Sequence, residues 1–342
     1  MTPVLPIQYD FSLQGLNTFG VAATAKAYLR VTSADMLRQV RNDDFLARLP
    51  RLVLGGGSNL LLTRDFAGLV LHMCTSGVEI IGEDAGAKYV KAAAGENWHQ
   101  FVQWTIGQGM GGLENLSLIP GSVGAAPIQN IGAYGVEMKD YFHSLTAFDL
   151  DTGEIFMLDK EACRFAYRDS IFKHALRDRV VILDVTFALP KKWQAHTQYA
   201  DVAQELASCA IASPGPQDIA DAIIAIRTRK LPDPAKIGNA GSFFQNPVVS
   251  ADLRDALLAS HPKLVSYPQP DGSYKLAAGW LIDQSGWKGK SMGAAGVYEK
   301  QALVLVNRGG ATGQEIAALA NAIQMDVMSR FGVMLEPEPV FI

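Results

Sequence analysis

The chain has 342 residues with a formal net charge of −4, and 49% of its residues are hydrophobic. This length allows two or three domains with well-buried cores. The slightly acidic charge excludes a general electrostatic attraction to nucleic acid or to anionic membrane surfaces.

Targeting and redox signals point to a cytoplasmic protein. The N-terminal residues MTPVLPIQYD lack the basic and apolar segments of a secretory signal, and no stretch approaches the ~20 apolar residues of a membrane span. The three cysteines, Cys74, Cys163 and Cys209, are odd in number and far apart, which suits a reducing compartment and gives no disulfide framework.

The first half of the chain predicts strands with few helices. Short apolar segments bounded by turn residues predict strands at residues 28–31, 52–54, 69–73, 78–81, 89–92, 145–150 and 180–189. Ser33 is placed to cap a helix whose apolar residues are Met36, Leu37, Val40 and Leu46. A second helix is predicted over residues 98–106. Because strands and helices do not alternate regularly, the pattern favours an α+β fold over a doubly wound sheet.

The composition changes at residues 213–216, Ser-Pro-Gly-Pro, and an α/β region follows. The helix predicted directly after this break has an apolar face formed by Ile219, Ala222, Ile223 and Ile226. Its basic end, residues 227–230, precedes two prolines that stop it.

The C-terminal part continues this α/β pattern. Helices are predicted near residues 251–260 and over residues 276–284, and a strand is predicted at residues 302–307. The last helix begins with a capping box, Thr312 with Glu315, and its apolar face is formed by Ile316, Leu319, Ile323 and Val327. Gly332 is the predicted C-cap.

Residues 115–136, NLSLIPGSVGAAPIQNIGAYGV, contain no charged residue and four glycines. Small residues at this density let a backbone approach a flat or anionic ligand, with N–H groups as donors, which suits a dinucleotide pyrophosphate. A tight loop between domains is the alternative.

Two other glycine clusters have different contexts. Residues 54–60, LGGGSNL, follow a predicted strand and lack the lysine of a P-loop, so they form either an anion nest with Ser58 and Asn59 as extra donors or a hairpin turn. Gly107, Gly109 and Gly112 match G-x-G-x-x-G but follow a helix, so we interpret them as a helix stop.

Metal-binding and serine-hydrolase patterns are absent from the sequence. The six histidines form no i, i+4 pair and no cluster with cysteine or carboxylate residues, so we expect no metal site. There is also no G-x-S-x-G nucleophile elbow.

Three distant segments carry candidate catalytic side chains. Ser242, between Gly241 and two phenylalanines, is either a proton donor in a tight, water-poor turn or a simple turn residue. Arg168, beside the polar residues of segment 167–170, has the planar fork that recognises a carboxylate. Glu338 ends the rigid segment LEPE and is a candidate proton donor or orienter. Their spacing alone does not show that the three meet.

A series of short sequence blocks runs nearly end to end along the chain: NTFG (17–20), GGGSN (55–59), GENW (95–98), GLEN (112–115), IPG (119–121) with Gly124, PIQNIGAYG (127–135), YRDSIFK (167–173), KLPDP (230–234), GSFF (241–244) with NP (246–247), AGWLID (278–283) and LEPE (335–338). In this order, the blocks resemble the UDP-N-acetylenolpyruvoylglucosamine reductase family, flavoenzymes that complete UDP-N-acetylmuramic acid for bacterial peptidoglycan. So many blocks in one order are a specific signal.

The resemblance implies a vanillyl-alcohol-oxidase-type fold, in which a two-lobed FAD-binding domain precedes an α/β substrate-binding domain. We expect the first FAD-binding lobe at residues 1–75, with the tail 333–342 returning to it. The second lobe is expected at residues 76–214 and the substrate-binding domain at 215–332. The resemblance is to the longer subtype, in which a tyrosine loop, here within residues 193–214, folds over the nucleotide substrate.

The resemblance also implies that FAD is the cofactor and NADPH a co-substrate that reduces the flavin first. Because neither glycine-rich loop contains histidine or cysteine, we expect FAD to be bound without a covalent bond. The residues expected to bind it are Gly55, Gly56, Gly57, Ser58, Asn59, Leu60, Ile119, Pro120, Gly121, Gly124, Ala125, Ala126, Ile128, Gly132 and Arg227.

In the reaction that the resemblance implies, hydride reaches C3 of the enolpyruvyl group. Arg168 and Glu338 match the positions that stabilise the resulting charge, and Ser242 matches the residue that protonates C2. The residues expected to bind substrate are Tyr167, Tyr199, Lys230, Asn246 and Gln301.

The chain departs from the family in two places. Ala125 and Ala126 stand where relatives often carry hydroxyls, so we expect the pyrophosphate to depend more on backbone donors. No basic residue lies two positions after Glu338, where relatives often have one.

Two other functions are considered. A flavin-dependent oxidase or dehydrogenase of the same fold, acting on an alcohol or sugar, would often tether FAD through histidine or cysteine and gives the GSFF block no role. A non-catalytic nucleotide-binding module would be excluded by a flavin that NADPH bleaches. The main hypothesis predicts a UDP-sugar as the small-molecule partner, with no nucleic acid, membrane or obligate protein partner.

Overall fold

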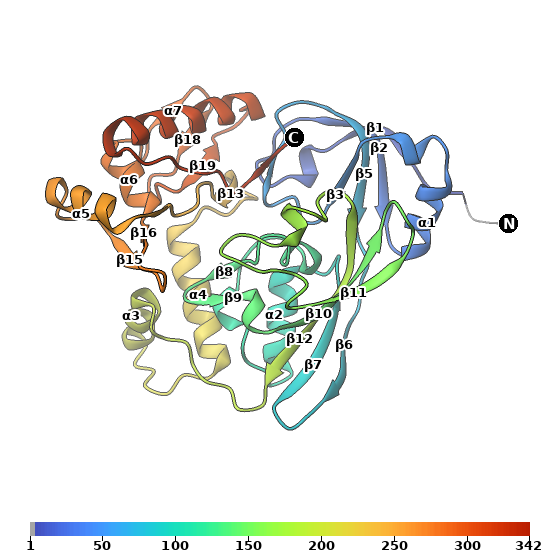
Figure 1. Cartoon of the computed structure of the whole chain (residues 1–342), viewed down its shortest axis with the longest axis horizontal. Helices are drawn as coiled ribbons and strands as arrows, with labels where there is room; N and C mark the ends of the chain where they lie inside the picture. Colours follow the sequence, from blue (N-terminus) through green and yellow to red (C-terminus); the bar gives the residue numbers. More distant parts are fainter. Residues whose placement is uncertain (1–3) are drawn as a thin grey trace. The chain divides into compact units, whose positions relative to one another are not determined.

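A computed structural model describes residues 4–342 of the chain. Its contacts divide the chain into two units, which we describe separately (Figure 1). Unit 1 comprises the residues up to Phe11, Thr24–Gly57 and Phe66–Arg229. Unit 2 comprises Ser12–Ala23, Ser58–Asp65 and Lys230–Ile342.

Unit 1 begins with a four-stranded sheet in the order β1-β2-β5-β3. Its strands are β1 (Gln8–Ser12), β2 (Thr24–Val31), β3 (Arg51–Leu54) and β5 (Phe66–Met73). Both β2 and β3 pair with β5 in parallel. Helix α1 (Ala34–Asn42) packs Leu37 and Val40 into the apolar cluster formed by β2 and β5, which confirms the strands and the helix predicted here.

The predicted length of α1 was wrong at its C-terminal end. The helix begins after Ser33, whose side chain makes no capping hydrogen bond, and it ends at Asn42. Leu46 is buried but belongs to a separate 3-10 turn, Leu46–Arg48. The carboxylate of Asp43 accepts the N–H groups of Phe45 and Leu46, and this local bonding competes with continuation of the helix.

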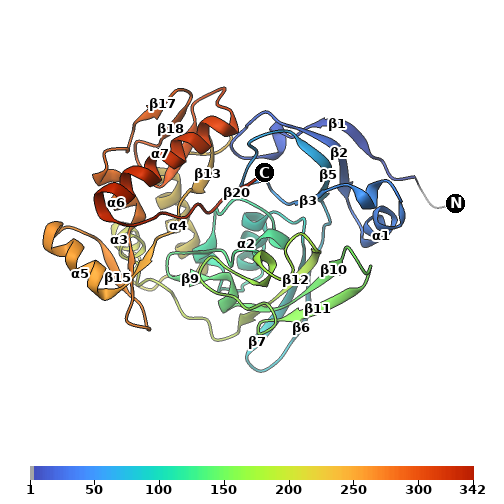
Figure 2. The same ribbon diagram turned by 45° about the horizontal axis from the view of Figure 1, so that its top comes forward.

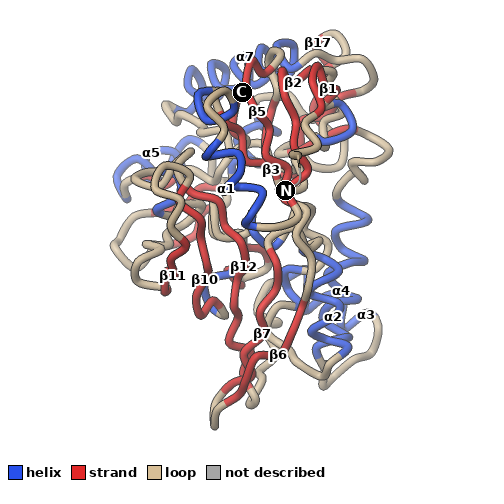
Figure 3. The backbone as a smooth tube through the Cα atoms, turned by 90° about the vertical axis from the view of Figure 1, so that its right-hand side faces the viewer, coloured by secondary structure: helices blue, strands red, loops and turns tan. Residues whose placement is uncertain are grey.

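The second sheet of unit 1 has five antiparallel strands in the order β11-β10-β12-β7-β6, drawn side by side in Figure 3. They are β6 (Val78–Glu83), β7 (Ala87–Ala93), β10 (Phe142–Asp149), β11 (Ile155–Asp159) and β12 (Val180–Pro190). Helix α2 (Trp98–Gly107) packs Trp98 and Phe101 against Phe187 of β12. The helix ends before Gly109, whose φ of 73° confirms the interpretation of this glycine cluster as a helix stop.

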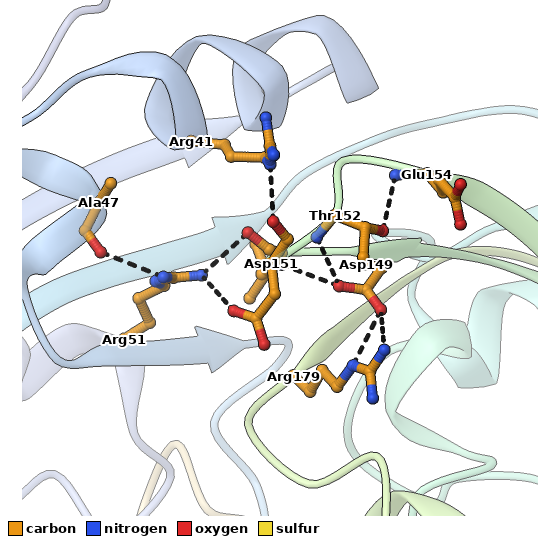
Figure 4. A network of polar contacts seen from close by, with 9 residues as sticks. Arg41, Ala47, Arg51, Asp149, Asp151, Thr152, Glu154 and Arg179 are labelled. Carbon is orange, nitrogen blue, oxygen red and sulfur yellow. Dashed lines mark hydrogen bonds and ion pairs between the residues drawn. The ribbon is translucent and has the colours of Figure 1, made fainter.

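Polar contacts connect the two sheets of unit 1, as Figure 4 shows. The buried carboxylate of Asp149 accepts hydrogen bonds from Arg179 and from the backbone N–H groups of Asp151 and Thr152. Burial alone would raise the pKa of Asp149, but these hydrogen bonds outweigh it and lower the pKa. Arg41, from α1, donates to the backbone oxygen of Asp151, so the turn after β10 is fixed to the first sheet's helix.

The remaining elements of unit 1 are two helices and two very short strands. Helices α3 (Ala200–Ser208) and α4 (Pro216–Lys230) pack on each other through an apolar cluster that includes Val202, Leu206, Ile219 and Ile223. The helix predicted after the Ser-Pro-Gly-Pro break is therefore confirmed as α4, whereas α3 was not predicted. Strands β8 (Gly132–Ala133) and β9 (Val136–Glu137) form a hairpin within the long glycine-rich segment.

Unit 2 contains three small sheets. The order of the first is β13-β19-β18-β17, and its strands are β13 (Gly238–Ser242), β17 (Ser291–Met292), β18 (Ala295–Val297) and β19 (Val304–Asn307). The second, β14-β16-β15, consists of β14 (Val248–Val249), β15 (Ser266–Pro268) and β16 (Tyr274–Leu276). In the third, β20 (Val340–Phe341) pairs in parallel with β4 (Leu60–Leu61).

The helices of unit 2 are α5 (Ala251–Ser260), α6 (Ala278–Gln284) and α7 (Gly313–Phe331). Figure 2 shows α6 and α7 beside β13 and β18. The predicted face of α7 is buried in one cluster with residues of α6 and β19. Thr312 and Glu315 form the predicted capping box, and Gly332 ends the helix with a φ of 65°. Helix α6 begins at Ala278, two residues later than predicted, because Leu276 belongs to β16.

Candidate active site

The two glycine-rich loops lie against each other in unit 1. A Cβ atom built on Gly56 would lie 2.8 Å from the Cα atom of Gly121, and one built on Gly55 would overlap the Oγ atom of Ser122. The two backbones can approach this closely only because glycine has no side chain. The structure thus brings together two loops that the sequence linked only through the family resemblance.

The second loop is fixed to the second sheet of unit 1. The N–H group of Gly124 donates to the oxygen of Ala94 at 2.9 Å, and a Cβ atom on Gly124 would lie 2.5 Å from the Cβ atom of Ala94. The N–H groups of Ala125 and Ala126 are bonded within the loop. In contrast, those of Gly56 and Gly121 donate no hydrogen bond within residues 4–342. Two backbone donors therefore remain for an anion where the loops meet.

The predicted cofactor-binding residues fall in both units. Those in unit 1 are Gly55, Gly56, Gly57, Ile119, Pro120, Gly121, Gly124, Ala125, Ala126, Ile128, Gly132 and Arg227, and those in unit 2 are Ser58, Asn59 and Leu60. Within unit 2, the side-chain amide of Asn59 donates to the backbone oxygen of Glu338 at 3.2 Å. The N–H group of Val340 donates to the oxygen of Asn59 at 3.0 Å, so the C-terminal tail is bound to the end of the first glycine loop.

Arg168 lies on the second glycine loop, although the two are far apart in sequence. Its Nη2 atom donates to the backbone oxygen of Gly132 at 3.0 Å, and its guanidinium carbon lies 5.3 Å from the ring centroid of Tyr167. The backbone of Arg168 has a φ of 55°, which is unusual for a residue other than glycine. The guanidinium is therefore held beside the loop predicted to bind the cofactor.

A second polar cluster of unit 1 surrounds Arg227, near the end of α4. Burial lowers the pKa of Arg227, while a hydrogen bond with Tyr134 opposes that shift. The Nε atom of Arg227 is buried and has no hydrogen-bond partner within residues 4–342, and the same holds for the Oδ1 atom of Asn115. The ring of Tyr199 lies edge-on to that of Tyr134, with centroids 5.3 Å apart. Buried polar atoms without partners suit a polar ligand in this region.

Ser242 and the LEPE segment come together in unit 2. The N–H group of Glu338 donates to the oxygen of Phe243 at 2.8 Å, and Phe244 pairs with Pro337. Gly241 has a φ of 70°, and the pairing of β13 with β19 shifts register between Asn239 and Ser242. This irregularity changes the direction in which the side chain of Ser242, the last residue of β13, projects. The hydroxyl of Ser242 makes no hydrogen bond with any described residue.

Two predicted substrate-binding residues of unit 2 lie at the start of α6. The Oδ1 atom of Asn246 accepts the N–H group of Ala278 at 2.9 Å. The Oε1 atom of Gln301 would lie 3.2 Å from a Cβ atom on Gly279, in the first turn of the same helix. Lys230 is the first residue of the long C-terminal segment of unit 2. Of the other predicted residues, Tyr167 and Tyr199 belong to unit 1.

Sequence reasoning did not single out the residues that organise these clusters. Asn130 is fully buried and bonds through its side chain to Glu137, Ala166 and Lys139. Tyr134 pairs with Arg227, as described above. One sequence signal could have identified Asn130 and Tyr134. Both are larger polar residues within a segment of glycines and alanines, where a side chain of this size needs a specific partner.

Unit 2 also contains a cavity of about 450 Å³ that none of the predicted site residues line. Its walls include Phe19 and Gly20 of the NTFG block, Gly238 at the start of β13, and Lys236 and Arg308. The backbone oxygen of Phe19 accepts a hydrogen bond from Asn307, and Asn239 donates to Thr18. The NTFG block therefore supports the strand that ends in Ser242.

Within residues 4–342 there is no group of three or more histidine, cysteine or carboxylate side chains arranged to hold a metal ion. In the same part of the chain, Cys74, Cys163 and Cys209 are all free thiols. No helix among the described residues has the length and hydropathy needed to cross a membrane.

Comparison with known proteins identifies two matching domains. Residues 25–159 match the FAD binding domain, and residues 233–342 match the UDP-N-acetylenolpyruvoylglucosamine reductase, C-terminal domain. The chain is 58% identical over 346 aligned positions to the UDP-N-acetylenolpyruvoylglucosamine reductase of Azoarcus sp., covering 100% of this chain and 99% of the relative. It is 59% identical to the reductase of Burkholderia vietnamiensis, covering 97% and 95%.

A solved structure agrees with the fold. The crystal structure of UDP-N-acetylenolpyruvylglucosamine reductase from Thermus caldophilus superimposes with a TM-score of 0.69 at 22% identity, covering 99% of this chain and 98% of that one. These matches confirm the expected fold class, a vanillyl-alcohol-oxidase-type FAD-binding domain followed by an α/β substrate-binding domain.

Proposed function

Because the chain belongs to the UDP-N-acetylenolpyruvoylglucosamine reductase family, we propose that Ser242, Arg168 and Glu338 are its catalytic residues. The enzyme uses NADPH and FAD to reduce the enolpyruvyl group of UDP-N-acetylglucosamine enolpyruvate, which yields UDP-N-acetylmuramate for peptidoglycan synthesis. The observation that supports the residue assignment best is the contact of the GSFF block with the LEPE segment, in which the N–H group of Glu338 donates to the oxygen of Phe243, the residue after Ser242.

The structure of unit 1 fits FAD, which, when bound, relays hydride from NADPH to C3 of the enolpyruvyl group. The unbonded N–H groups of Gly56 and Gly121 suit the oxygens of a pyrophosphate. The buried Nε atom of Arg227, which has no partner among the described residues, suits a carbonyl or anionic oxygen of the same cofactor. We therefore assign the pyrophosphate to the two glycine loops and place Arg227 near the flavin.

The role we propose for Arg168 follows from its fixed charge. Hydride addition at C3 leaves negative charge that C2 shares with the neighbouring carboxylate of the substrate. A guanidinium stays protonated at any relevant pH and binds a carboxylate through two parallel hydrogen bonds. Stabilising charge that develops in the transition state is worth several kcal/mol, about 3–4 kcal/mol for a single well-placed donor.

Ser242 completes the reaction by giving its hydroxyl proton to C2, so that one hydride and one proton are added across the double bond. A serine hydroxyl is a weak acid, and it therefore needs close positioning, which the bulge after Asn239 and the pairing with LEPE supply. Glu338, in the adjoining LEPE segment, assists by stabilising the same charge-bearing group through a proton or an ordered water.

Substrate binding is assigned to residues of both units. Tyr199, Lys230, Asn246 and Gln301 hold the UDP phosphates, and Tyr167 lies beside Arg168. We keep the expected division of the chain: residues 1–75 and 76–214 bind FAD, residues 215–332 bind the nucleotide sugar, and the tail 333–342 returns to the first lobe. The parallel pairing of β20 with β4 supports this last point.

An anaerobic titration tests the proposed function. NADPH is expected to bleach the flavin of the purified chain, and the enolpyruvyl sugar nucleotide is expected to restore its absorbance. Glu338→Gln should slow the second step and leave the first within about twofold, because only the second develops charge on the substrate. A variant that behaves as the wild type in both steps would remove Glu338 from the catalytic group.

We further propose that the enzyme works in the cytoplasm, where UDP-sugar precursors are made, and that it needs no obligate protein partner. Full turnover by the purified chain alone, with only NADPH and the UDP-sugar added, would support the second point. A strict requirement for a cell extract would contradict it.

A further inference from the structure

The backbone at Arg168 adopts a conformation that its residue type does not favour. Arg168 has a φ of 55°, in the left-handed region that L-residues with long side chains rarely adopt. It lies in a tight turn closed by two hydrogen bonds, from the N–H group of Ala166 to the oxygen of Asp169 at 3.0 Å and from Asp169 back to Ala166 at 3.3 Å. Contacts from outside the turn must hold this conformation.

Three side chains hold the turn before, at and after Arg168. The Nδ2 atom of Asn130 donates to the oxygen of Ala166 at 3.0 Å. The Nζ atom of Lys173 donates to the oxygen of Arg168 itself at 2.9 Å, and the Oγ atom of Ser170 donates to the oxygen of Ile128 at 2.6 Å. Asn130 and Ile128 belong to the second glycine loop, so two of the three bonds join the turn to that loop.

Two of these side chains, those of Asn130 and Ser170, are buried and make hydrogen bonds both as donor and as acceptor. Asn130 is 0% exposed and also donates to Glu137 and accepts from Lys139. Ser170 is 1% exposed, and its hydroxyl accepts from Phe172 while it donates to Ile128. Buried groups with every bond satisfied fix a single geometry, because any other arrangement leaves a donor or acceptor without a partner.

We propose that Asn130, Ser170 and Lys173 are positioning residues that fix Arg168 in its left-handed turn and thereby aim its guanidinium at the substrate carboxylate. This inference rests on the catalytic role proposed above for Arg168. Within unit 1, the hydrogen bond from the guanidinium to Gly132 acts at the tip of the side chain, whereas the bonds of Asn130, Ser170 and Lys173 fix the backbone from which the side chain projects. Recognition of a planar carboxylate requires placement within about 0.5 Å, and a 1 Å error can cost about 100-fold in rate.

Lys173 offers the cleanest test, because it is partly exposed and its ammonium bonds only to the oxygen of Arg168 among the described residues. Lys173→Met keeps the length of the side chain and removes the donor, and Lys173→Arg restores a donor. His174→Gln is the matched control, because His174 is the next residue and pairs with Asp169 without touching Arg168. Each variant is compared by melting temperature, by the rate of flavin reduction with NADPH, and by the rate of flavin reoxidation with the enolpyruvyl substrate.

We expect Lys173→Met to slow reoxidation about 10- to 100-fold while reduction by NADPH and the melting temperature stay close to wild type. Lys173→Arg should recover most of the loss, and His174→Gln should leave both steps within about twofold. Equal slowing of both steps, or a lower melting temperature with unchanged rates, would reduce Lys173 to a structural residue and overturn the inference. Ser170→Ala and Ser170→Thr repeat the comparison at the other end of the turn.

A double-mutant cycle separates this inference from the role of Arg168 itself. If Lys173 acts through Arg168, Lys173→Met has no further effect on reoxidation in an Arg168→Ala background. Equal effects of Lys173→Met in both backgrounds would contradict the positioning role while leaving Arg168 catalytic. If Arg168→Ala alone does not slow reoxidation, the proposed role of Arg168 fails, and the positioning role fails with it.

Discussion

Replacing Ser242 by alanine should separate catalysis from stability. The Ser242 hydroxyl makes no hydrogen bond with the described residues, and alanine accepts the same extended backbone, so the free energy of unfolding should change by less than about 0.5 kcal/mol. The melting temperature should therefore stay within about 2 °C of wild type. If Ser242 delivers the proton to C2, the loss is far larger in rate, because general acid catalysis contributes about 10²- to 10⁴-fold, or roughly 3–5 kcal/mol of activation free energy.

Stopped-flow absorbance measures the two half-reactions of this variant separately. Flavin reduction by NADPH needs no proton from Ser242 and should proceed at nearly the wild-type rate. Reoxidation by the enolpyruvyl substrate should slow at least about 100-fold, and Ser242→Cys, a stronger acid of similar shape, should recover part of that loss. Equal slowing of both steps, or of neither, would show that Ser242 only shapes the turn.

Four further predictions address the cofactor, the substrate and the fold. Gly56→Ala should weaken FAD binding about 5- to 150-fold, because the new Cβ atom would lie 2.8 Å from the backbone of Gly121. Gly107→Ala is the control and should retain FAD, because a Cβ atom at Gly107 has open space around it. Fluorescence titration with FAD compares the two variants. Acid precipitation should release all yellow colour into the supernatant, and colour in the pellet would contradict non-covalent binding. Lys230→Ala and Tyr199→Phe should raise KM at least about tenfold with kcat within about threefold, and the reverse pattern would make them catalytic. Asp149→Ala should lower the free energy of unfolding by about 2–4 kcal/mol at pH 7. The pKa of Asp149 is lowered in the folded protein, so its contribution to the free energy of unfolding is fully present above the unfolded pKa near 4. This contribution is lost as the pH falls through the folded pKa. Denaturation at pH 2–3 should therefore show a smaller difference in stability between variant and wild type.

The elements that the sequence predicted correctly are those whose signals lie within a few residues. Helix α7 has an apolar face of regular spacing, a capping box at Thr312 and a glycine at its end, and all three features are observed. Helix α4 follows a proline-rich break and buries the predicted face. In both cases backbone preference, side-chain pattern and end signals agree, and such agreement makes a local prediction reliable.

The missed elements have no local signal of this kind. Strands β14, β17 and β20 are two residues long, too short for any periodicity, and β20 exists only because it pairs with β4 from the other end of the chain. The early end of α1 depends on one aspartate side chain, Asp43, that outcompetes the helix backbone. The short pairings follow from tertiary geometry, which spacing along the chain does not contain. The bonds of Asp43 are local, but the spacing of apolar residues does not reveal them.

The candidate site was predicted residue by residue, but its assembly was not. Residue types identified a carboxylate-binding arginine, a serine in a tight turn and two glycine-rich loops, while the resemblance supplied the connection among them. The structure adds physical reasons for part of it: Gly56 meets Gly121 backbone to backbone, and the N–H group of Glu338 bonds to Phe243 beside Ser242. Both contacts join segments far apart in sequence, which no pattern in a single chain reveals.

The strain in this protein is concentrated around the second glycine loop. Of the eight non-glycine residues with positive φ in the described part of the chain, four are Leu118, Asn130, Tyr134 and Arg168. Three of these lie in the loop, and the fourth is bonded to it. Local preference disfavours this conformation at Leu118, Tyr134 and Arg168, although asparagine tolerates it. Tertiary contacts must therefore maintain it at these three residues, and such conformations gather in natural proteins where function requires a particular geometry. Substitutions that remove these bonds should therefore disturb the placement of cofactor and substrate before they unfold the protein, whereas substitutions in the core of α7 should act in the opposite order.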